Sequence, residues 1–322
     1  MSAVSERGFV SGFVSILGRP NAGKSTLLNT LIGSKIAIVT DKPQTTRNRI
    51  QGVLNRPEAQ IIFLDTPGIH KPNTRINQKM MAEVREALQG CDLLLLLVDA
   101  ARPFGPGDEY ALQLVKKAGR PCFLLLNKID RLADKRKLLP LIERYRNQHD
   151  FREIIPVSAL TGEGLEELVP ETIAALPEGP QYFPPGHLTD QPARFLAGEI
   201  IREKIILLTR QELPYATMAL VERFEEKPGL LRIHATVFVE REGQKGILIG
   251  ARGERMKKIG TLARKELEKL FGQKVYLGLF VKVRPGWRES PQFLQATDWR
   301  SMVGEDMAGE DMDDLEEGPL AV

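Results

Sequence analysis

The sequence predicts a two-part α/β protein, in which a phosphate-binding domain built on a mostly parallel sheet precedes a smaller α+β domain. Short apolar runs alternate with amphipathic segments as far as about residue 176. The octet GRPNAGKS follows the first of these runs, and after residue 188 the order of patterns changes to α-β-β-α-α-β. These observations predict the fold class, and 322 residues are enough for two cores.

Composition is that of a soluble globular protein, with 42% hydrophobic and 27% charged residues. Cys91 and Cys122 each lie beside an apolar run, so we expect buried, reduced thiols rather than a disulfide or a zinc site. The first residues lack the pattern of a secretory signal, and the longest apolar run, at 93–98, is too short to span a bilayer. We therefore expect a cytoplasmic protein.

Five apolar runs in the first part are candidate strands: FVSI, IIFLD, LLLLLVD, CFLLLN and EIIPVSA. They are apolar throughout rather than alternating, which is typical of parallel strands covered on both faces. Helical periodicity lies between them, at about 24–33, 75–89, 108–118, 134–148 and 164–175. Residues 8–176 are therefore expected to form a doubly wound sheet, with ligand loops at the carboxyl ends of its strands.

The octet at 18–25 has the spacing of a phosphate-binding loop between a strand and a helix. Its glycines would let backbone N–H groups surround a β-phosphate, Lys24 would reach the β and γ oxygens, and Ser25 would bind Mg²⁺. The nucleotide-binding residues predicted here are Gly18, Arg19, Pro20, Asn21, Ala22, Gly23, Lys24, Ser25 and Thr26.

Two later strand ends select the base. In NKID, the carboxylate of Asp130 can accept both the N1–H and the N2 amino protons of guanine, whereas adenine would leave it desolvated and unpaired. In VSAL, the backbone of Ser158 and Ala159 can face the guanine O6. Together with Asn127 and Lys128, these residues predict that the first part binds GTP.

The stretch IIFLDTPG supplies the remaining phosphate contacts. Asp65 would hold Mg²⁺ through water, the Gly68 N–H would contact the γ-phosphate, and Thr66 and Pro67 lie between them. In DKPQTTRNRI, Thr45 or Thr46 offers the hydroxyl that closes on Mg²⁺. The predicted metal ligands are Ser25, Asp65 and one of these two threonines.

The motifs GRPNAGKS, QTTR, DTPG, NKID and SAL, in this order, resemble those of the TrmE–Era–EngA group of translation-related GTPases. The resemblance implies that Thr46 is the metal-binding threonine and that Asn21 matches an asparagine that helps to hold K⁺ in some members. A loop-capping role for Asn21 stays open. Ile69 stands where Ras-like enzymes carry the glutamine that orients water, so hydrolysis should be slow or depend on a partner or cation. His70 receives no role, and no catalytic residue is assigned.

The charge distribution separates the rest of the chain into three segments. A segment rich in proline and glycine predicts a semi-rigid linker over 177–187. Residues 188–290 contain 20 Lys or Arg and 13 Asp or Glu, which favours a polyanion-binding domain. Residues 291–322 contain nine acidic residues and one Arg, which predicts a solvated acidic tail that could compete with polyanions for the basic domain.

Within 188–290, the tetrad GARG at 250–253 lies between two helical segments in an α-β-β-α-α-β order. This is the arrangement of a type II KH domain, whose loop binds about four nucleotides of single-stranded RNA. The alternative is a basic, solvated helix on a small α/β domain. Residues 247–249 would form one wall of the RNA site, with some of them in the core. The predicted RNA-binding residues are Lys245, Ile247, Ile249, Gly250, Ala251, Arg252, Gly253, Arg255, Lys257 and Lys258.

Taken together, residues 8–290 resemble the Era family, in which a P-loop GTPase domain precedes a type II KH domain. The resemblance implies a monomeric GTPase that uses GTP/GDP and Mg²⁺, and K⁺ if it is like those members in which the asparagine holds this ion. It further implies binding to the 3′ end of 16S rRNA, a role in assembly of the 30S ribosomal subunit with GTP hydrolysis as the switch, and peripheral contact with the inner face of the cell membrane. The rivals are a signalling GTPase whose basic domain binds a protein or acidic lipid, and a metabolic NTPase.

Overall fold

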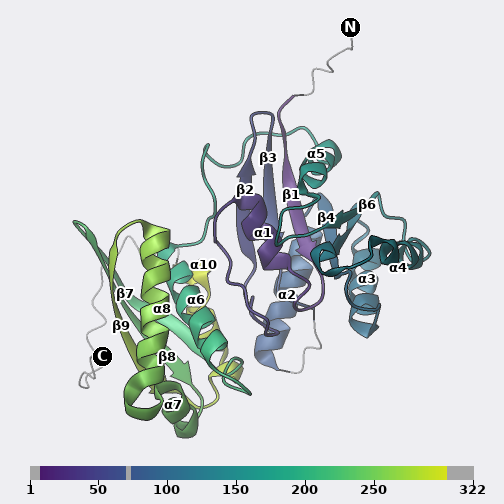
Figure 1. Cartoon of the computed structure of the whole chain (residues 1–322). Coiled ribbons are helices and arrows are strands. Elements are labelled where there is room, and N and C mark those ends of the chain that lie inside the picture. The colour runs from purple at the N-terminus through teal and green to yellow at the C-terminus, as the bar shows by residue number, and fades with distance from the viewer. Residues whose placement is uncertain (1–7, 70–73, 303–322) are drawn as a thin grey trace. The chain divides into compact units, whose positions relative to one another are not determined.

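A computed structural model describes residues 8–69 and 74–302 of the chain. The chain divides into two compact units: the first ends at Asp190, and the second contains the chain from Gln191 onward together with Thr74–Ile76. Each unit has its own sheet and its own core, as Figure 1 shows.

The first unit contains a six-stranded sheet in the order β2-β3-β1-β4-β5-β6. Only β2, at one edge, pairs antiparallel, which confirms the predicted mostly parallel sheet. β2 was not predicted from the sequence, because its residues lie beside a hairpin turn and include Gln51 and Gly52. The strands are β1 (Val10–Leu17), β2 (Ile50–Asn55), β3 (Ala59–Asp65), β4 (Leu93–Asp99), β5 (Cys122–Asn127) and β6 (Glu153–Val157).

Helices cover both faces of this sheet (Figure 1). Alternate residues of β4 enter different cores: Leu95 packs with the core beside α1 and α5, and Leu96 with the core beside α2 and α3. This two-sided burial explains why the strands are apolar throughout. The helices are α1 (Lys24–Ile32), α2 (Arg75–Gln89), α3 (Pro106–Ala118), α4 (Leu138–Arg146) and α5 (Leu165–Ala175), with 3₁₀ turns η1 (Ile129–Arg131) and η2 (Lys135–Lys137).

Both cysteines of the chain are buried free thiols in this unit. Burial raises the pKa of Cys91 to about 11 and that of Cys122 to about 12. Their thiols are therefore protonated and unreactive at neutral pH, as their apolar neighbours predict.

The proline- and glycine-rich segment 177–187 crosses the ends of β1, β3 and β2, at the edge of the sheet where the parallel strands begin. The fully buried side chain of Gln60 on β3 organises it: Oε1 accepts the backbone N–H groups of Tyr182 and Phe183, each at 2.9 Å, and Nε2 donates to the Phe183 carbonyl. The Ser11 hydroxyl donates to the carbonyl of Pro180 at 2.7 Å. We call 177–187 the edge strap. The sequence predicts a linker here, whereas the structure shows a segment that is hydrogen-bonded to the first unit.

The second unit contains a three-stranded sheet, β7-β8-β9, with β7 and β8 antiparallel and β8 and β9 parallel. Three helices pack on one face of it, and the core between them includes Ile201, Ile233, Leu248 and Ile259. The α-β-β-α-α-β order is thereby confirmed. Its elements are α6 (Ala193–Leu208), β7 (Met218–Lys227), β8 (Leu230–Val239), α7 (Glu242–Ile249), η3 (Ala251–Gly253), α8 (Glu254–Phe271) and β9 (Lys274–Val283).

The chain beyond β9 corrects the predicted tail. Residues 291–302, assigned above to an acidic tail, form α9 (Pro291–Ala296) and α10 (Trp299–Met302) after the turn η4 (Trp287–Glu289). They fold because their apolar side chains are buried: Phe293 lies edge-on to Phe238 of β8, with ring centroids 5.0 Å apart, and Trp299 packs on Phe195. Residues 303–322, the rest of the predicted acidic tail, lie outside the described residues. Among the described helices, none combines the length and apolarity needed to cross a membrane.

Candidate functional site

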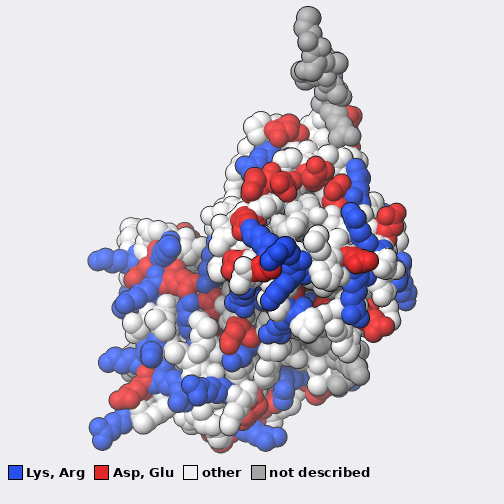
Figure 2. Space-filling view, turned by 45° about the vertical axis from the view of Figure 1, so that its right-hand side comes forward, with Lys and Arg blue, Asp and Glu red and all other residues white. Residues whose placement is uncertain are grey.

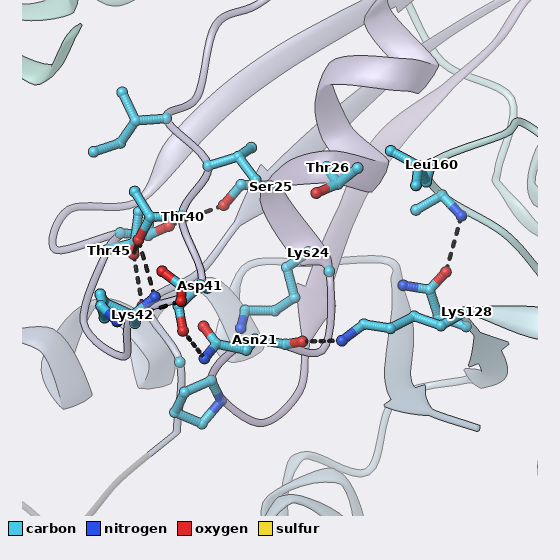
Figure 3. A pocket seen from close by; sticks show the side chains of 18 of the residues that line it. Asn21, Lys24, Ser25, Thr26, Thr40, Asp41, Lys42, Thr45, Lys128 and Leu160 are labelled. Atoms are coloured by element: carbon cyan, nitrogen blue, oxygen red, sulfur yellow. Dashed lines mark hydrogen bonds and ion pairs between the residues drawn. The ribbon is translucent and has the colours of Figure 1, made fainter. Parts of the chain in front are cut away.

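A pocket of about 360 Å³ opens at the carboxyl ends of the strands of the first sheet (Figure 3). The β1–α1 loop, the segment 38–46, the β5–η1 loop and the loop after β6 form its walls. Ligand sites in doubly wound sheets lie at this end of the strands. Of the predicted nucleotide-binding residues, the lining includes Pro20, Asn21, Gly23, Lys24, Ser25, Thr26, Gly68, Asn127, Lys128, Asp130 and Ala159.

The β1–α1 loop requires its glycines. Gly23 caps α1 with φ of 104°, and a Cβ there would lie 2.3 Å from the Asn127 side-chain nitrogen. A Cβ on Gly18 would lie 2.3 Å from the Leu97 carbonyl oxygen. The loop therefore closes tightly over the strand ends, and its backbone N–H groups and the first turn of α1 face the pocket.

Lys24, the first residue of α1, is buried below the loop. Its ammonium donates to the carbonyl oxygens of Gly18 and Arg19 at 3.1 and 3.2 Å. Burial lowers its pKa to about 8, against the attraction of Asp65, which acts to raise it. Negative phosphate oxygens beside this ammonium would stabilise its charged form.

The three predicted metal ligands come together. The Ser25 hydroxyl donates to Asp65 Oδ2 at 2.6 Å and lies 2.9 Å from the Thr46 hydroxyl. Asp65 Oδ1 is buried with no hydrogen-bond partner among the described residues. A carboxylate with a free buried oxygen next to two hydroxyls has the donor chemistry that Mg²⁺ prefers, so these residues fit the ion. Thr45 turns the other way, its hydroxyl contacting Thr40 and Lys42.

Burial also perturbs the Asp65 carboxyl. Desolvation raises its pKa to about 6, against the lowering effects of Lys24, Ser25 and Thr46. A divalent cation beside this group would favour the ionised form, so metal binding and proton release are coupled here.

The predicted base-binding residues are also brought together. Asn127 links three loops, donating to the Ala22 carbonyl at 2.7 Å and accepting the Ala159 N–H at 2.9 Å. The Ser158 hydroxyl donates to Asp130 Oδ1 at 2.7 Å, which fixes the orientation of the carboxylate. The remaining Asp130 oxygen, Oδ2, is thereby available for an amide-like edge of guanine.

Lys128 has an unusual backbone and a defined partner. Its φ is +68°, and its ammonium donates to the Asn21 carbonyl at 2.6 Å and to Asp99 Oδ2 at 2.7 Å. Asp99 was not predicted from the sequence, although it ends an apolar strand as Asp65 does. Neither was Asp108, an acidic residue in the first turn of α3 that pairs with Arg19 at 2.6 Å and thereby ties the loop to α3.

The stretch after Asp65 is anchored in the core. The Thr66 hydroxyl donates to the Ile16 carbonyl at 2.7 Å, and a Cβ on Gly68 would lie 2.9 Å from Pro20. Pro67 lies between these two contacts. Ile69 is 4% exposed and packs with Met81, so its side chain cannot orient water in the pocket. His70 lies outside the described residues.

In the second unit, the GARG loop has a backbone that favours glycine. Gly250, Arg252 and Gly253 have φ of 75°, 50° and 78°, and a Cβ on Gly250 would lie 2.8 Å from the Arg255 Cβ. Arg255 donates to the Ile247 carbonyl at the end of α7, which directs its guanidinium to that helix. Ala251 and Arg252 lie at the exposed tip between α7 and α8.

The remaining predicted RNA-binding residues separate into exposed and buried groups. Ile247, Lys257 and Lys258 are exposed, Lys245 and Ile249 are half-buried, and Leu248 belongs to the core. Figure 2 shows Lys and Arg side chains projecting from the second unit, at the left of that view. This part of the second unit therefore presents an exposed apolar side chain on α7 and exposed basic side chains on η3 and α8, as a surface for single-stranded nucleic acid requires.

Comparisons with known proteins agree with this geometry. A family of 50S ribosome-binding GTPases matches residues 13–128, and the KH domain family matches residues 212–288. GTPase Era of Syntrophus aciditrophicus (strain SB) is 52% identical over 289 residues, which cover 89% of this chain and 94% of that protein. GTPase Era of Geobacter metallireducens is 51% identical over 294 residues, which cover 91% of this chain and 98% of that protein.

Two solved structures each match 90% of this chain. An Aquifex aeolicus Era variant bound to GDP and AlF₄⁻ has a TM-score of 0.87 and 41% identity, over 90% of this chain and 99% of that one. Era in complex with MgGDPNP and nucleotides 1506–1542 of 16S ribosomal RNA has a TM-score of 0.88 and 42% identity, with the same coverage.

Proposed function

The chain belongs to the Era family of GTPases, and from this premise we propose that it recognises 16S rRNA near its 3′ end and acts in assembly of the 30S subunit. The observation that carries the proposal is the meeting of Ser25, Thr46 and Asp65 beside the Asp130–Ser158 pair, in a chain that also carries a GARG loop. The solved relative bound to both MgGDPNP and this RNA supports it.

We assign GTP binding to the first unit. Asp130, held by Ser158, accepts the two guanine protons, and Asn127 keeps the loops that surround the base in place. Lys24 and the N–H groups of the β1–α1 loop bind the β- and γ-phosphates. Ser25, Thr46 and Asp65 would hold Mg²⁺, which when bound would neutralise the charge that builds up on the phosphates.

Ile69 is buried and apolar and cannot orient the attacking water, so hydrolysis in this site depends on another group. We infer that K⁺ supplies part of it. The Asn21 side-chain nitrogen donates to the Asp41 carbonyl at 2.7 Å, a contact that fixes the orientation of the amide (Figure 3). The Asn21 side-chain oxygen would be the ligand of K⁺, which when bound would add positive charge near the phosphates.

RNA binding is assigned to the second unit. Lys257, Lys258 and Arg252 would contact the phosphates, and Ile247 the bases, while the glycines of the loop allow close approach of the RNA backbone. We propose that the GTP-bound first unit favours RNA binding and that hydrolysis releases the RNA. A monomer acting in the cytoplasm, with peripheral contact to the membrane, stays a prediction from the family resemblance.

The test is the affinity for an RNA that copies the small-subunit 3′ end, measured with a non-hydrolysable GTP analogue and with GDP at one salt concentration. A base-scrambled RNA is the control. We expect preference for the true sequence, and several-fold tighter binding with the GTP analogue. Equal binding to both RNAs, or equal affinity in both nucleotide states, would contradict the RNA target or the switch respectively. Salt-dependent binding to anionic vesicles with no RNA preference would favour the signalling alternative.

A further inference from the structure

The sheet of the second unit has a second face, opposite to α6, α7 and α8. On each strand, alternate residues point away from the helical core, and strand register places them in rows: Arg223–His234–Gly278, Glu225–Arg232–Tyr276 and Lys227–Leu230–Lys274. Phe280, two residues beyond Gly278 on β9, lies on the same side. We call this part of the sheet the open sheet face.

Another part of this side of the sheet is covered by α9, and its aromatic residue is less exposed than those of the open sheet face. Where α9 packs on the sheet, Phe238 lies under Phe293 and is only 9% exposed. On the open sheet face, Tyr276 is 49% exposed, and His234 and Phe280 are half-buried. The aromatic side chains continue from the covered part into the open part, where the Tyr276 ring is the exposed one.

Three rings form one aromatic strip across β8 and β9. The His234 ring lies 5.5 Å from the Tyr276 ring and 6.5 Å from the Phe280 ring, nearly parallel to the latter. Gly278 makes room for the imidazole, because a Cβ at that position would lie 2.9 Å from His234 Nδ1. Any other residue would displace the central ring of the strip.

Positive charge surrounds the strip. The three rows hold four basic side chains and one carboxylate, Glu225, and the basic residues Arg223, Arg232 and Lys274 are exposed. Planar rings beside guanidinium and ammonium groups, on a flat sheet, match unpaired nucleobases that carry phosphates. An apolar protein partner would leave these cations desolvated and unpaired.

We propose that the open sheet face binds unpaired nucleotides of RNA by stacking on Tyr276, His234 and Phe280. The site is separate from the GARG loop, which belongs to the helical layer on the other side of the sheet. It deepens the proposed function and rests on it. Because β9 is an edge strand, an RNA bound along the helical side can continue around this edge to the open sheet face.

The test compares two RNAs by fluorescence anisotropy with the full chain. One copies the single-stranded small-subunit 3′ end, and the other carries the same sequence extended by unpaired uridines. We expect the extension to tighten binding, and Tyr276→Ala to weaken the binding of the extended RNA about tenfold, since stacking on one ring is worth this much. Tyr276→Phe, which keeps the ring, and Tyr110→Ala, which removes an exposed tyrosine from α3, should bind as the unsubstituted chain does.

The two proposals fail in different ways. If the unsubstituted chain binds the true and the scrambled RNA equally, the proposed RNA target fails, and if it binds no RNA at all, the open sheet face fails as well. If it binds the short RNA but gains nothing from the extension, and Tyr276→Ala has no effect, only the open sheet face fails. Thermal melting of Tyr276→Ala checks that the fold is intact.

A second readout reports stacking directly. The chain contains two tryptophans, Trp287 and Trp299, both buried, so Tyr276→Trp adds an exposed indole to a quiet background. Stacked bases should quench this indole when the extended RNA binds. Inorganic polyphosphate, a polyanion without bases, should leave its emission unchanged. Quenching by polyphosphate to the same extent, or no quenching by RNA, would overturn the stacking.

Discussion

Lowering the pH from about 7 to about 5 should weaken Mg²⁺-dependent nucleotide binding about tenfold through Asp65 alone. Burial raises the pKa of this carboxyl to about 6, and its ionised form is the one that can hold the metal. At pH 7 about nine tenths of it is ionised, whereas at pH 5 about nine tenths is protonated. The apparent Mg²⁺ affinity falls in proportion to the ionised fraction.

The assay is a Mg²⁺ titration of a fluorescent GDP analogue bound to the protein, repeated across this pH range. The phosphates of the nucleotide also titrate, so Asp65→Asn is the matched control, because it keeps the shape of the side chain and removes its titration. The steeper pH dependence of the unsubstituted chain is the contribution of Asp65. Parallel pH profiles for the two proteins would refute the reasoning.

The same shift has a consequence for stability, with a definite sign. The pKa of Asp65 is raised from 3.8, so its contribution to the free energy of unfolding is fully present below that pH and is lost as the pH rises through about 6. The loss is on the order of 3 kcal/mol. At pH 7, Asp65→Asn should therefore stabilise protein that has been stripped of nucleotide and metal, although it weakens Mg²⁺ binding. Urea unfolding of stripped protein at pH 7 measures this.

Three further substitutions test other parts of the structure. Asp130→Asn should lower GTP affinity about 100-fold, because an amide cannot accept both guanine protons. The variant should bind xanthosine triphosphate better than the unsubstituted chain does. Unchanged GTP binding in a competition assay would exclude Asp130 from the base site. Gln60→Leu should destabilise the first unit by about 3 kcal/mol in urea unfolding, since two backbone N–H groups of the edge strap lose their acceptor, while the exposed Gln148→Leu should change little. Gly250→Ala should weaken RNA binding about tenfold and leave GTP hydrolysis unchanged, because φ of 75° and the close Arg255 Cβ both oppose a side chain. The control is Gly243→Ala in α7, where a Cβ has open space, and equal RNA affinities of the two variants would contradict the role of the loop.

The nucleotide site could be read from the sequence because each of its parts is local. A strand, a tight turn and a helix start suffice to place Gly23, Lys24 and Ser25, and the strand ends place Asp65 and Asn127 at the same edge of the sheet. The choice between Thr45 and Thr46 was not local. Adjacent residues point in opposite directions, and the backbone of 38–46 decides which hydroxyl reaches Ser25.

Other features depend on contacts between distant parts of the chain. The edge strap is held by Gln60, more than 120 positions away, and a polar residue inside a strand gives no sign of such a partner. The helices α9 and α10 were missed because the acidic residues after 302 dominate the composition of 291–322, although Phe293 and Trp299 are apolar. The open sheet face required strand register, since Tyr276 and His234 are neighbours only across β8 and β9.

The edge strap sets where the protein can be divided for separate expression of its halves. A fragment that ends after α5, the last helix of the first unit, would lack the edge strap that covers the ends of β1, β2 and β3. The Gln60 side-chain amide would then have no backbone partners from the strap. The uncovered, partly apolar strand ends of such a fragment would promote self-association. A cut after Asp190 keeps the edge strap in place on these strands. Solubility and yield of the isolated first unit should therefore depend on the fewer than twenty residues between α5 and Asp190, although they contribute nothing to the nucleotide pocket.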